Sequence, residues 1–245
     1  MLAAMPVMAA YTGHVYVDKN KNGVFDQSEK PLAGIKVSDG LNVVETAADG
    51  SFTLPGHERE RFIFITTPSG YKTFNRHYHK IEKKQSGYDF GLIPYSGRIR
   101  KNGSHRYIHI ADTEMFNTEN HADWVNNVRD YARNEQAAFI IHTGDICYEK
   151  GLKAHIKLMN TENMDCPVFY CIGNHDLVKG KYGEELFESI YGPVYYSFDA
   201  GNVHYVVTPM PGGDHAPGYT SDDVCRWLKN DLAHIRPGTP VVVFN

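Results

Sequence analysis

The sequence is poor in cysteine and has no long apolar run, no strong net charge and no repeated segment. Its 245 residues include four cysteines and no Cys-x-x-Cys pair, which excludes a disulfide scaffold and a structural zinc site. Lysine and arginine number 25 against 29 acidic residues, a net charge of −4, so composition gives no support to a nucleic-acid partner. No apolar stretch reaches the roughly 18 residues that a transmembrane helix needs, so none is expected.

The remaining composition is that of an ordinary globular protein. Apolar residues make up 42% of the chain and charged residues 22%, which argues against disorder. The 22 glycines follow no triplet period, which argues against collagen. Since a domain holds about 150 residues, the length predicts one large domain or two modest ones.

The first ten residues are apolar, uncharged and rich in small side chains. This pattern resembles the second half of a secretory signal peptide with Val7-Met8-Ala9 as a cleavage site, although the basic leading segment is missing. The alternative is an ordinary N-terminal tail. The pattern favours export to the periplasm or the extracellular space, with residues 1–10 as a remnant of the signal.

Residues 11–96 have the pattern of an all-β domain. Short runs rich in valine, isoleucine, phenylalanine and tyrosine alternate with the turn signals Asp39-Gly40, Asp49-Gly50 and Pro55-Gly56. Short strands at such regular spacing favour a small β-sandwich. The predicted strands are His14–Val17, Ile35–Val37, Val43–Thr46, Ser51–Leu54 and Phe62–Thr66.

Residues 104–245 alternate strands with helices, after a polar junction over Tyr95–Gly103. The helical patterns span Ala122–Arg133 and Ser221–Ile235, the second with Ser221 and Asp222 as N-caps. Such alternation predicts an α/β layered sandwich, whose ligands lie beyond the C-terminal ends of the strands. The predicted strands are Tyr107–Ile110, Phe139–His142, Val168–Ile172, His204–Val207 and Val241–Phe244.

An oxygen-rich loop lies near the start of the first half. Residues 18–29 fit the pattern D-x-[DN]-x-[DN]-G-x5-E at every fixed position, which places hard oxygen donors around one Ca²⁺ ion and Gly23 at the sharp turn. Strand and turn patterns flank this loop, so it joins strands and its role is structural. The alternative is a turn that stays empty, because Asn20 and Asn22 carry no charge. The predicted ligands are Asp18, Asn20, Asn22, Val24 through its carbonyl, Asp26 and Glu29.

Three polar segments each follow a predicted strand of the second half. They are Asp112-Thr-Glu114, Thr143-Gly144-Asp145 and Gly173-Asn174-His175-Asp176. The carboxyl ends of neighbouring parallel strands meet at one edge of a sheet. Carboxylates gathered there repel one another unless a cation lies among them. A pair of divalent ions about 3.5–4 Å apart, bridged by a shared carboxylate, is the natural resolution.

This half resembles the calcineurin-like metallophosphoesterase superfamily, whose motifs run DxH, GDxx, GNH(D/E), a lone His and GHxH. Residues 173–176 after the apolar run Val168–Ile172 match the most distinctive motif, and Gly144-Asp145 matches the second. A hairpin pattern over Tyr195–His204 also fits, so that the resemblance covers roughly residues 105–245. Residues 11–96 resemble the calcium-binding B-type repeats of bacterial surface proteins, and also the N-terminal domain often placed before secreted members of the superfamily.

The resemblance implies metal ligands and a catalytic acid. Asp112 resembles a ligand of the first metal, Asp145 the bridging ligand and Asn174 a ligand of the second metal. His175 resembles the histidine that contacts the phosphate and protonates the leaving group, and Asp176 would orient it through a hydrogen bond. Two divalent ions are therefore implied, with Mn, Fe, Zn and Mg all left open.

The sequence departs from the family pattern in two places. Glu114 stands where DxH has histidine; its carboxylate would favour Mn or Mg over Zn, or would turn away from the metal. No Gly-His-x-His follows Asn174, so the lone histidine and this motif, three ligands in all, are missing. Because residues 240–245 have the pattern of a core strand, a poor natural terminus, a truncated C-terminal half is favoured over a degenerate site.

The sequence thus predicts a metal-dependent enzyme that hydrolyses a phosphate ester on a small molecule or a macromolecule. The alternative is a non-catalytic surface or binding protein with a degenerate phosphoesterase fold and a calcium-stapled β domain. The Pro/Gly-rich segment Met210–Tyr219 is expected near the mouth of the site, either in contact with substrate or as a plain surface loop. His142 is interpreted as a strand-packing residue and Cys147 as a small buried one.

Overall fold

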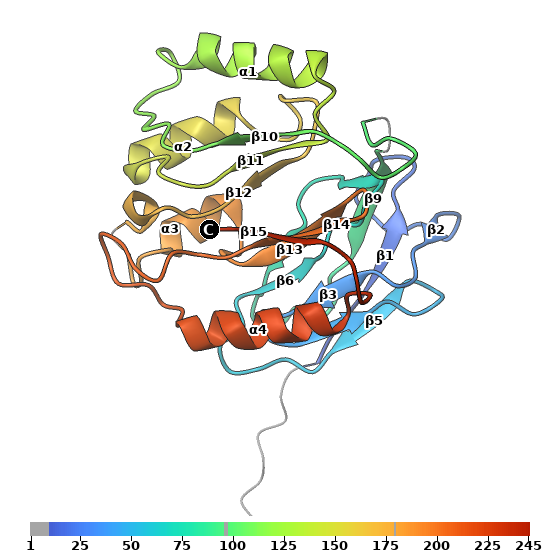
Figure 1. Ribbon diagram of the computed structural model, residues 1–245. Coiled ribbons are helices and arrows are strands. Elements are labelled where there is room, and N and C mark those ends of the chain that lie inside the picture. Colours follow the sequence, from blue (N-terminus) through green and yellow to red (C-terminus); the bar gives the residue numbers. More distant parts are fainter. Residues whose placement is uncertain (1–9, 96–97, 179) are drawn as a thin grey trace, which may run out of the picture.

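The computed structural model describes residues 10–95, 98–178 and 180–245. Within these residues the chain is a mixed α/β protein with four sheets and four α-helices (Figure 1). Residues 1–9, and with them nearly all of the predicted export segment, lie outside the described residues.

The N-terminal part contains two sheets. One has the strand order β2-β1-β9-β7, with β5 also paired to β1, and the other has the order β4-β3-β6-β8. β1 and β9 are parallel, and the other pairs are antiparallel. The strands are β1 (Tyr11–Val17), β2 (Lys30–Pro31), β3 (Lys36–Ser38), β4 (Val43–Glu45), β5 (Ser51–Leu54), β6 (Phe62–Ile65), β7 (Tyr71–Thr73), β8 (Tyr78–Lys80) and β9 (Phe90–Pro94).

These two sheets enclose one hydrophobic core. Val15 of β1, Val37 of β3 and Leu92 of β9 are fully buried in it. Successive side chains of a strand point to opposite faces, so each of these strands sends alternate residues inward. The region is therefore β-rich and self-packed, as its alternating pattern predicts.

The C-terminal part contains two three-stranded sheets. In the first, β10, β11 and β12 are all parallel. In the second, β13 and β14 form the expected antiparallel hairpin and β15 runs parallel to β14. Its strands are β10 (Tyr107–Ile110), β11 (Phe139–His142), β12 (Val168–Tyr170), β13 (Tyr196–Ala200), β14 (Val203–Val207) and β15 (Val241–Phe244). Its helices are α1 (Ala122–Asn134), α2 (Tyr148–Leu158), the 3-10 turn η1 (Asn174–Asp176), α3 (Glu185–Tyr191) and α4 (Ser221–Ala233).

Both faces of the parallel sheet are covered, which explains the continuous apolar run of β11. Ile140 packs toward α1 and α2, whereas Phe139 and Ile141 face the second sheet. Figure 1 shows α1 and α2 on one side of β10-β11-β12 and the β13-β14-β15 sheet on the other. The rings of Phe169 and Phe198 stack across this interface with their centroids 3.7 Å apart.

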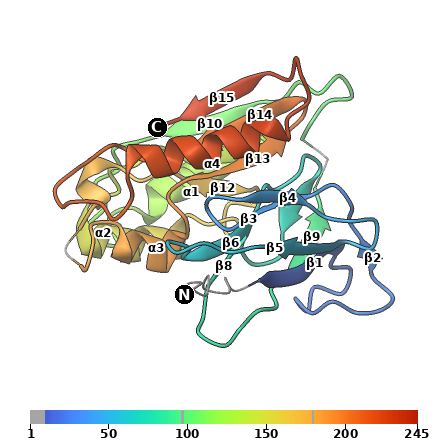
Figure 2. The same ribbon diagram turned by 90° about the horizontal axis from the view of Figure 1, so that it is seen from below.

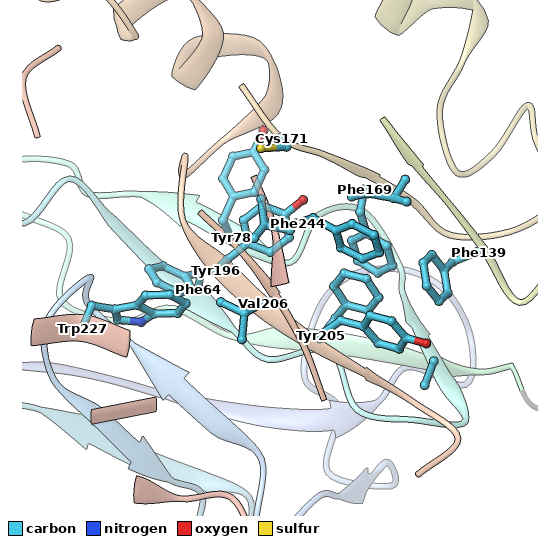
Figure 3. Close-up of a cluster of buried hydrophobic side chains, with 14 of the residues drawn as sticks. Phe64, Tyr78, Phe139, Phe169, Cys171, Tyr196, Tyr205, Val206, Trp227 and Phe244 are labelled. Atoms are coloured by element: carbon cyan, nitrogen blue, oxygen red, sulfur yellow. The ribbon is translucent and has the colours of Figure 1, made fainter. Parts of the chain in front are cut away.

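Strand β6 joins the two halves of the chain through a shared core. All four of its residues are buried. Ile63 and Ile65 point into the N-terminal core, while Phe62 and Phe64 point into the core of the C-terminal half. Figure 3 shows Phe64 beside Trp227 of α4, with their ring centroids 6.2 Å apart. The β4-β3-β6-β8 sheet is therefore covered on both faces.

Further contacts fix the two halves side by side. The Asp199 N–H of β13 donates to the Thr67 carbonyl just after β6, at 2.8 Å. The side-chain amide of Asn230 in α4 donates to the Leu41 carbonyl before β4, at 2.8 Å. Figure 2 shows α4 lying alongside β4. The polar junction after residue 95 thus connects parts that share one interior.

Two local expectations are corrected by the structure. Thr220, not Ser221 or Asp222, caps α4: its hydroxyl accepts the Asp223 N–H at 3.2 Å, and Asp223 bonds back in a capping box. β15 is not a buried core strand, since Val241 and Val243 expose 42% and 53% of their surface. β15 lies at the edge of its sheet, and an apolar run alone does not separate an edge strand from a central one.

All four cysteines are free thiols; Cys147, Cys166 and Cys171 are buried and Cys225 is exposed. No helix of the described ranges has the length and hydropathy to cross a membrane.

Candidate functional site

The three polar segments singled out in the sequence leave the same edge of the parallel sheet. Ile110 of β10, His142 of β11 and Tyr170 of β12 lie at one level in the strand register. The segment bearing Asp112 therefore begins beside the segment bearing Asp145. The segment bearing Asn174 lies on the other side of Asp145.

Asp145 is in contact with both neighbouring segments. The Asp112 N–H donates to the Gly144 carbonyl at 3.0 Å, and the Glu114 N–H donates to the Asp145 carbonyl at 3.2 Å. On the other side, the His175 N–H donates to Asp145 Oδ1 at 3.1 Å. The predicted bridging residue thus occupies the middle position among the three segments.

These segments have an unusual backbone. Of the nine non-glycine residues with positive φ in the described ranges, five lie here, namely Asp112, Glu114, Asp145, Cys147 and Tyr148. Positive φ is costly for residues with a Cβ and concentrates at functional sites. The turns are also tight, because a Cβ on Gly144 would lie 2.3 Å from the Gly173 nitrogen.

The carboxylates of these segments contribute to the raised pKa of the Cys147 thiol. Burial raises the pKa of Cys147 to about 12, and Asp176, Glu114, Asp145 and Asp112 add to the effect in that order. A thiol with so high a pKa is not a nucleophile at neutral pH.

The carboxylate oxygens are not gathered into one tight cluster. Among the described residues, one group of three His, Cys, Asp or Glu side chains has ligand atoms all within 4.8 Å of one another, and it is Asp39, His57 and Glu60. The oxygens of Asp112, Glu114 and Asp145 are therefore spread more widely than this. The segments that carry these three residues are adjacent, but their carboxylate oxygens do not all lie within 4.8 Å of one another.

The Asp39, His57 and Glu60 cluster is a candidate metal site in the N-terminal half that sequence patterns did not indicate. The three residues also have protein partners: His57 Nε2 lies 3.0 Å from the Asp39 carbonyl, and the Glu60 carboxylate accepts the His57 N–H and the Tyr11 hydroxyl. Asp39 Oδ1 accepts the Asn42 N–H at 2.7 Å. Hydrogen bonds within the protein thus account for this cluster.

His175 has a carboxylate partner that the sequence did not reveal. Its Nδ1 lies 2.9 Å from Asp214 Oδ2, and Asp214 belongs to the Pro/Gly-rich loop after β14. The hydrogen bond to Asp214 raises the pKa of His175, with further contributions from the charges of Asp214, Asp145 and Glu114. The expectation that this loop lies near the site is consistent with this contact.

The expected role of Asp176 is corrected. Its Oδ1 accepts the Cys147 N–H at 2.9 Å and its Oδ2 accepts the Gly173 N–H at 3.0 Å, so both oxygens are engaged by backbone. Burial raises the pKa of this carboxyl, against the lowering effect of those bonds. Asp176 therefore ties two of the segments together, and Asp214 takes the place predicted for it beside His175.

The oxygen-rich loop joins β1 to the short strand β2, as predicted from its flanks. The carboxylates of Asp18 and Glu29 are buried. Asp18 Oδ2 accepts the Gly23 N–H at 2.9 Å, and Glu29 Oε2 accepts the Asp26 N–H at 3.2 Å. The loop thus folds around its own acidic oxygens.

Comparison with known families agrees with this geometry. The family model described as calcineurin-like phosphoesterase matches residues 105–242, and that described as the N terminal of calcineurin-like phosphoesterase matches residues 19–94. The first match covers more than half of the chain, so the chain belongs to the calcineurin-like phosphoesterase family. No curated protein matches it. Membership supports a hydrolase of the metallophosphoesterase kind with a divalent metal and a phosphorylated substrate.

The residues at the strand ends fit such a metal by their chemistry. Asp112, Glu114 and Asp145 offer carboxylate oxygens, and Asn174 offers an amide oxygen; these are the donors that Mg and Mn prefer. Their segments are adjacent, joined by backbone hydrogen bonds from Asp112 to Gly144 and from Glu114 to Asp145. A cation would offset the mutual repulsion of these groups.

Proposed function

We propose that the protein hydrolyses a phosphate ester at a dinuclear metal site at the ends of β10, β11 and β12. Asp112 and Glu114 would hold the first ion, Asp145 would bridge the two, and Asn174 would hold the second. A divalent ion bound there supplies Lewis-acid polarisation of the phosphoryl group and a nucleophile at neutral pH. The observation that carries the proposal is the central position of Asp145, in hydrogen-bond contact with both neighbouring segments.

His175 is the residue suited to handle a proton at the leaving group. Its ring is part exposed, which allows contact with substrate, and Asp214 holds it through Nδ1. Nε2 is then the ring nitrogen left to donate a proton. Tyr148 lies next to it, with ring centroids 5.7 Å apart, and limits the positions that the imidazole can take.

The family pattern includes three further histidine ligands, which the 245 residues do not supply. A longer polypeptide that adds them, together with more strands of a layered sandwich, stays a prediction; the coding sequence past Asn245 tests it directly. Without those ligands, we expect the 245-residue chain to turn over a phosphate ester slowly or not at all. Wild-type turnover by this chain alone would contradict that expectation.

The experiment that tests the function is hydrolysis of p-nitrophenyl phosphate by the polypeptide expressed from the full coding sequence, with Mn²⁺. Asp145→Ala should abolish turnover while leaving the protein folded, and Asp130→Ala, an exposed residue of α1, is the matched control. Equal rates for Asp145→Ala and wild type would reject the proposal. An intact, folded protein with no metal and no turnover would instead favour the non-catalytic binding protein.

We also propose a structural Ca²⁺ ion in the loop over residues 18–29, in a small β-sandwich of two sheets. Its support is the buried position of Asp18 and Glu29, two carboxylates whose charges would be compensated by an ion. Export to the periplasm or the extracellular space is proposed on the N-terminal pattern alone. Fractionation of cells that express the full coding sequence tests the location.

A further inference from the structure

We infer that His142 is a positioning residue that holds the Asp112–Glu114 segment against the segment bearing Asp145. This inference deepens the proposed function and rests on it for the metal, but the contacts themselves lie in the protein. His142 is the last residue of β11 and is fully buried. It lies three residues before Asp145 in the sequence.

Each ring nitrogen of His142 contacts a different segment of the site. The Gly144 N–H donates to Nδ1 at 3.1 Å, which fixes the turn that leads into Asp145. Nε2 lies 3.0 Å from Thr113 Oγ1, the hydroxyl of the residue between Asp112 and Glu114. One side chain therefore links the segment bearing Asp112 and Glu114 to the turn that leads into Asp145.

The hydrogen bonds also define the state of the ring. A nitrogen that accepts an N–H carries no proton, so Nδ1 is unprotonated and His142 is neutral. The proton of a neutral imidazole then lies on Nε2 and is donated to Thr113. This single tautomer satisfies both contacts, and an aliphatic residue in the same strand position satisfies neither.

The backbone that His142 holds is strained. Asp112 and Glu114, on either side of Thr113, have φ of 53° and 41°, and Asp145 has φ of 53°. Such conformations persist only where the surroundings impose them. Backbone bonds from Asp112, Glu114 and Met115 to the carbonyls of residues 144–146 fix the distance between the segments. The imidazole adds the side-chain contact that fixes Thr113.

A second buried histidine provides an internal comparison. His155 of α2 is also fully buried and packs edge-on against His142, with ring centroids 4.9 Å apart. Neither ring nitrogen of His155 has a hydrogen-bond partner among the described residues. Burial alone therefore does not explain the hydrogen bonds of His142.

The test uses Thr113→Val, which removes the hydroxyl at nearly constant shape, with Thr113→Ser as the rescue variant and Asp130→Ala, an exposed residue of α1, as the control. Two quantities are measured on the 245-residue chain: hydrogen exchange of the Asp112, Glu114 and Met115 amides, and the Kd for Mn²⁺ by calorimetry. In Thr113→Val we expect the three amides to exchange at least roughly tenfold faster while amides of β11 stay unchanged, and the Kd to rise roughly 10- to 100-fold. Thr113→Ser and Asp130→Ala should resemble wild type.

His142→Phe, which removes both contacts, should give a larger effect on the same amides. Unchanged exchange of the three amides in Thr113→Val and in His142→Phe would overturn the inference. Faster exchange throughout the protein would also overturn it, because the role would then be general stability. If the wild-type chain binds no Mn²⁺, the proposed function fails in this chain. Faster exchange confined to the three amides in Thr113→Val would still establish the contact between His142 and Thr113.

Discussion

The imidazole of His175 and the carboxylate of Asp214 lie 2.9 Å apart, although 39 residues separate them in the sequence. His175 follows β12, whereas Asp214 lies in the loop between β14 and α4. The Asp214 N–H also donates to the Asn174 carbonyl at 3.1 Å. The loop therefore closes onto the segment that carries a proposed metal ligand and the proposed acid.

Asp214→Ala should lower the rate through misplacement of His175. General acid catalysis contributes about 10²–10⁴-fold, and losing the orienting partner should remove roughly tenfold to a hundredfold of it. Turnover of p-nitrophenyl phosphate by the metal-loaded protein checks this, with kcat expected to fall more than KM changes. Asp222→Asn, on the exposed start of α4, is the control. Equal kcat values for Asp214→Ala and wild type would show that His175 does not need this partner.

Two neighbouring glycines of the same loop should differ in their tolerance of alanine. A Cβ on Gly213 would lie 2.3 Å from the Asn174 carbonyl oxygen, while a Cβ on Gly212 would have no atom within 4 Å. Gly213→Ala should therefore push the loop off Asn174, with a cost of about 1–3 kcal/mol in unfolding free energy and a lower kcat. Gly212→Ala should stay within about 0.5 kcal/mol. Urea unfolding of the two variants decides this, and equal stabilities would reject the described loop position.

The stability of the protein should fall as pH rises above about 6.5, the ordinary pKa of histidine, because of His204. Burial opposes protonation of this imidazole, but Asp199 of β13 at 2.6 Å and Asp231 of α4 at 2.7 Å outweigh it and raise the pKa of His204. Lys36 of β3 is the further charge nearby, 3.3 Å from Asp199. A raised folded-state pKa stabilises fully below the unfolded value of about 6.5, and the contribution disappears as pH rises through the folded value.

His204→Gln should remove this contribution, so the slope of unfolding free energy against pH above about 6.5 should be shallower than in wild type. The measurement is urea unfolding across a pH series, with His14→Gln, a half-exposed histidine of β1, as control. Parallel curves for wild type and His204→Gln would contradict the raised pKa of His204.

Ca²⁺ should stabilise the N-terminal half against unfolding. At a hundredfold excess over Kd, a ligand that binds only the folded state adds about 2.7 kcal/mol, and Glu29→Gln should lose most of this gain by removing one carboxylate of the loop. Thermal unfolding with Ca²⁺ and with a chelator measures the gain, and Glu82→Gln, exposed and outside the loop, is the control. A wild-type transition that does not respond to Ca²⁺ would show that the loop is an empty turn.

The strands with the strongest apolar patterns were predictable. Tyr107–Ile110, Phe139–His142 and Val241–Phe244 have the predicted bounds, because each is a short apolar run between polar segments. The short polar strands β7 and β8 carry no such pattern and form because partner strands pair with them. All four residues of β6 are apolar, a pattern that is typical of a strand covered on both faces. Because this strand was predicted to belong to the N-terminal domain alone, its packing against the C-terminal half was not predicted.

The site was predictable to the level of segments, since motif spacing and parallel topology place residues 112–114, 143–145 and 173–176 at one edge. The ligand set itself stays a prediction. Asp214 was not predictable, because an aspartate in a Pro/Gly-rich loop has no periodic pattern and its contact arises only when the loop closes. The link from His142 to Thr113 depends in the same way on side-chain geometry that the strand pattern does not contain.

The proposed metal site depends most directly on Asp145 as its central ligand. The decisive measurement is the Mn²⁺ content and Kd of the polypeptide expressed from the full coding sequence, for wild type and for Asp145→Asn, by calorimetry and elemental analysis. We expect two ions per wild-type molecule and, for Asp145→Asn, fewer ions and a Kd at least about tenfold higher. Equal Mn²⁺ binding by the two proteins would contradict the role of Asp145 as the central ligand.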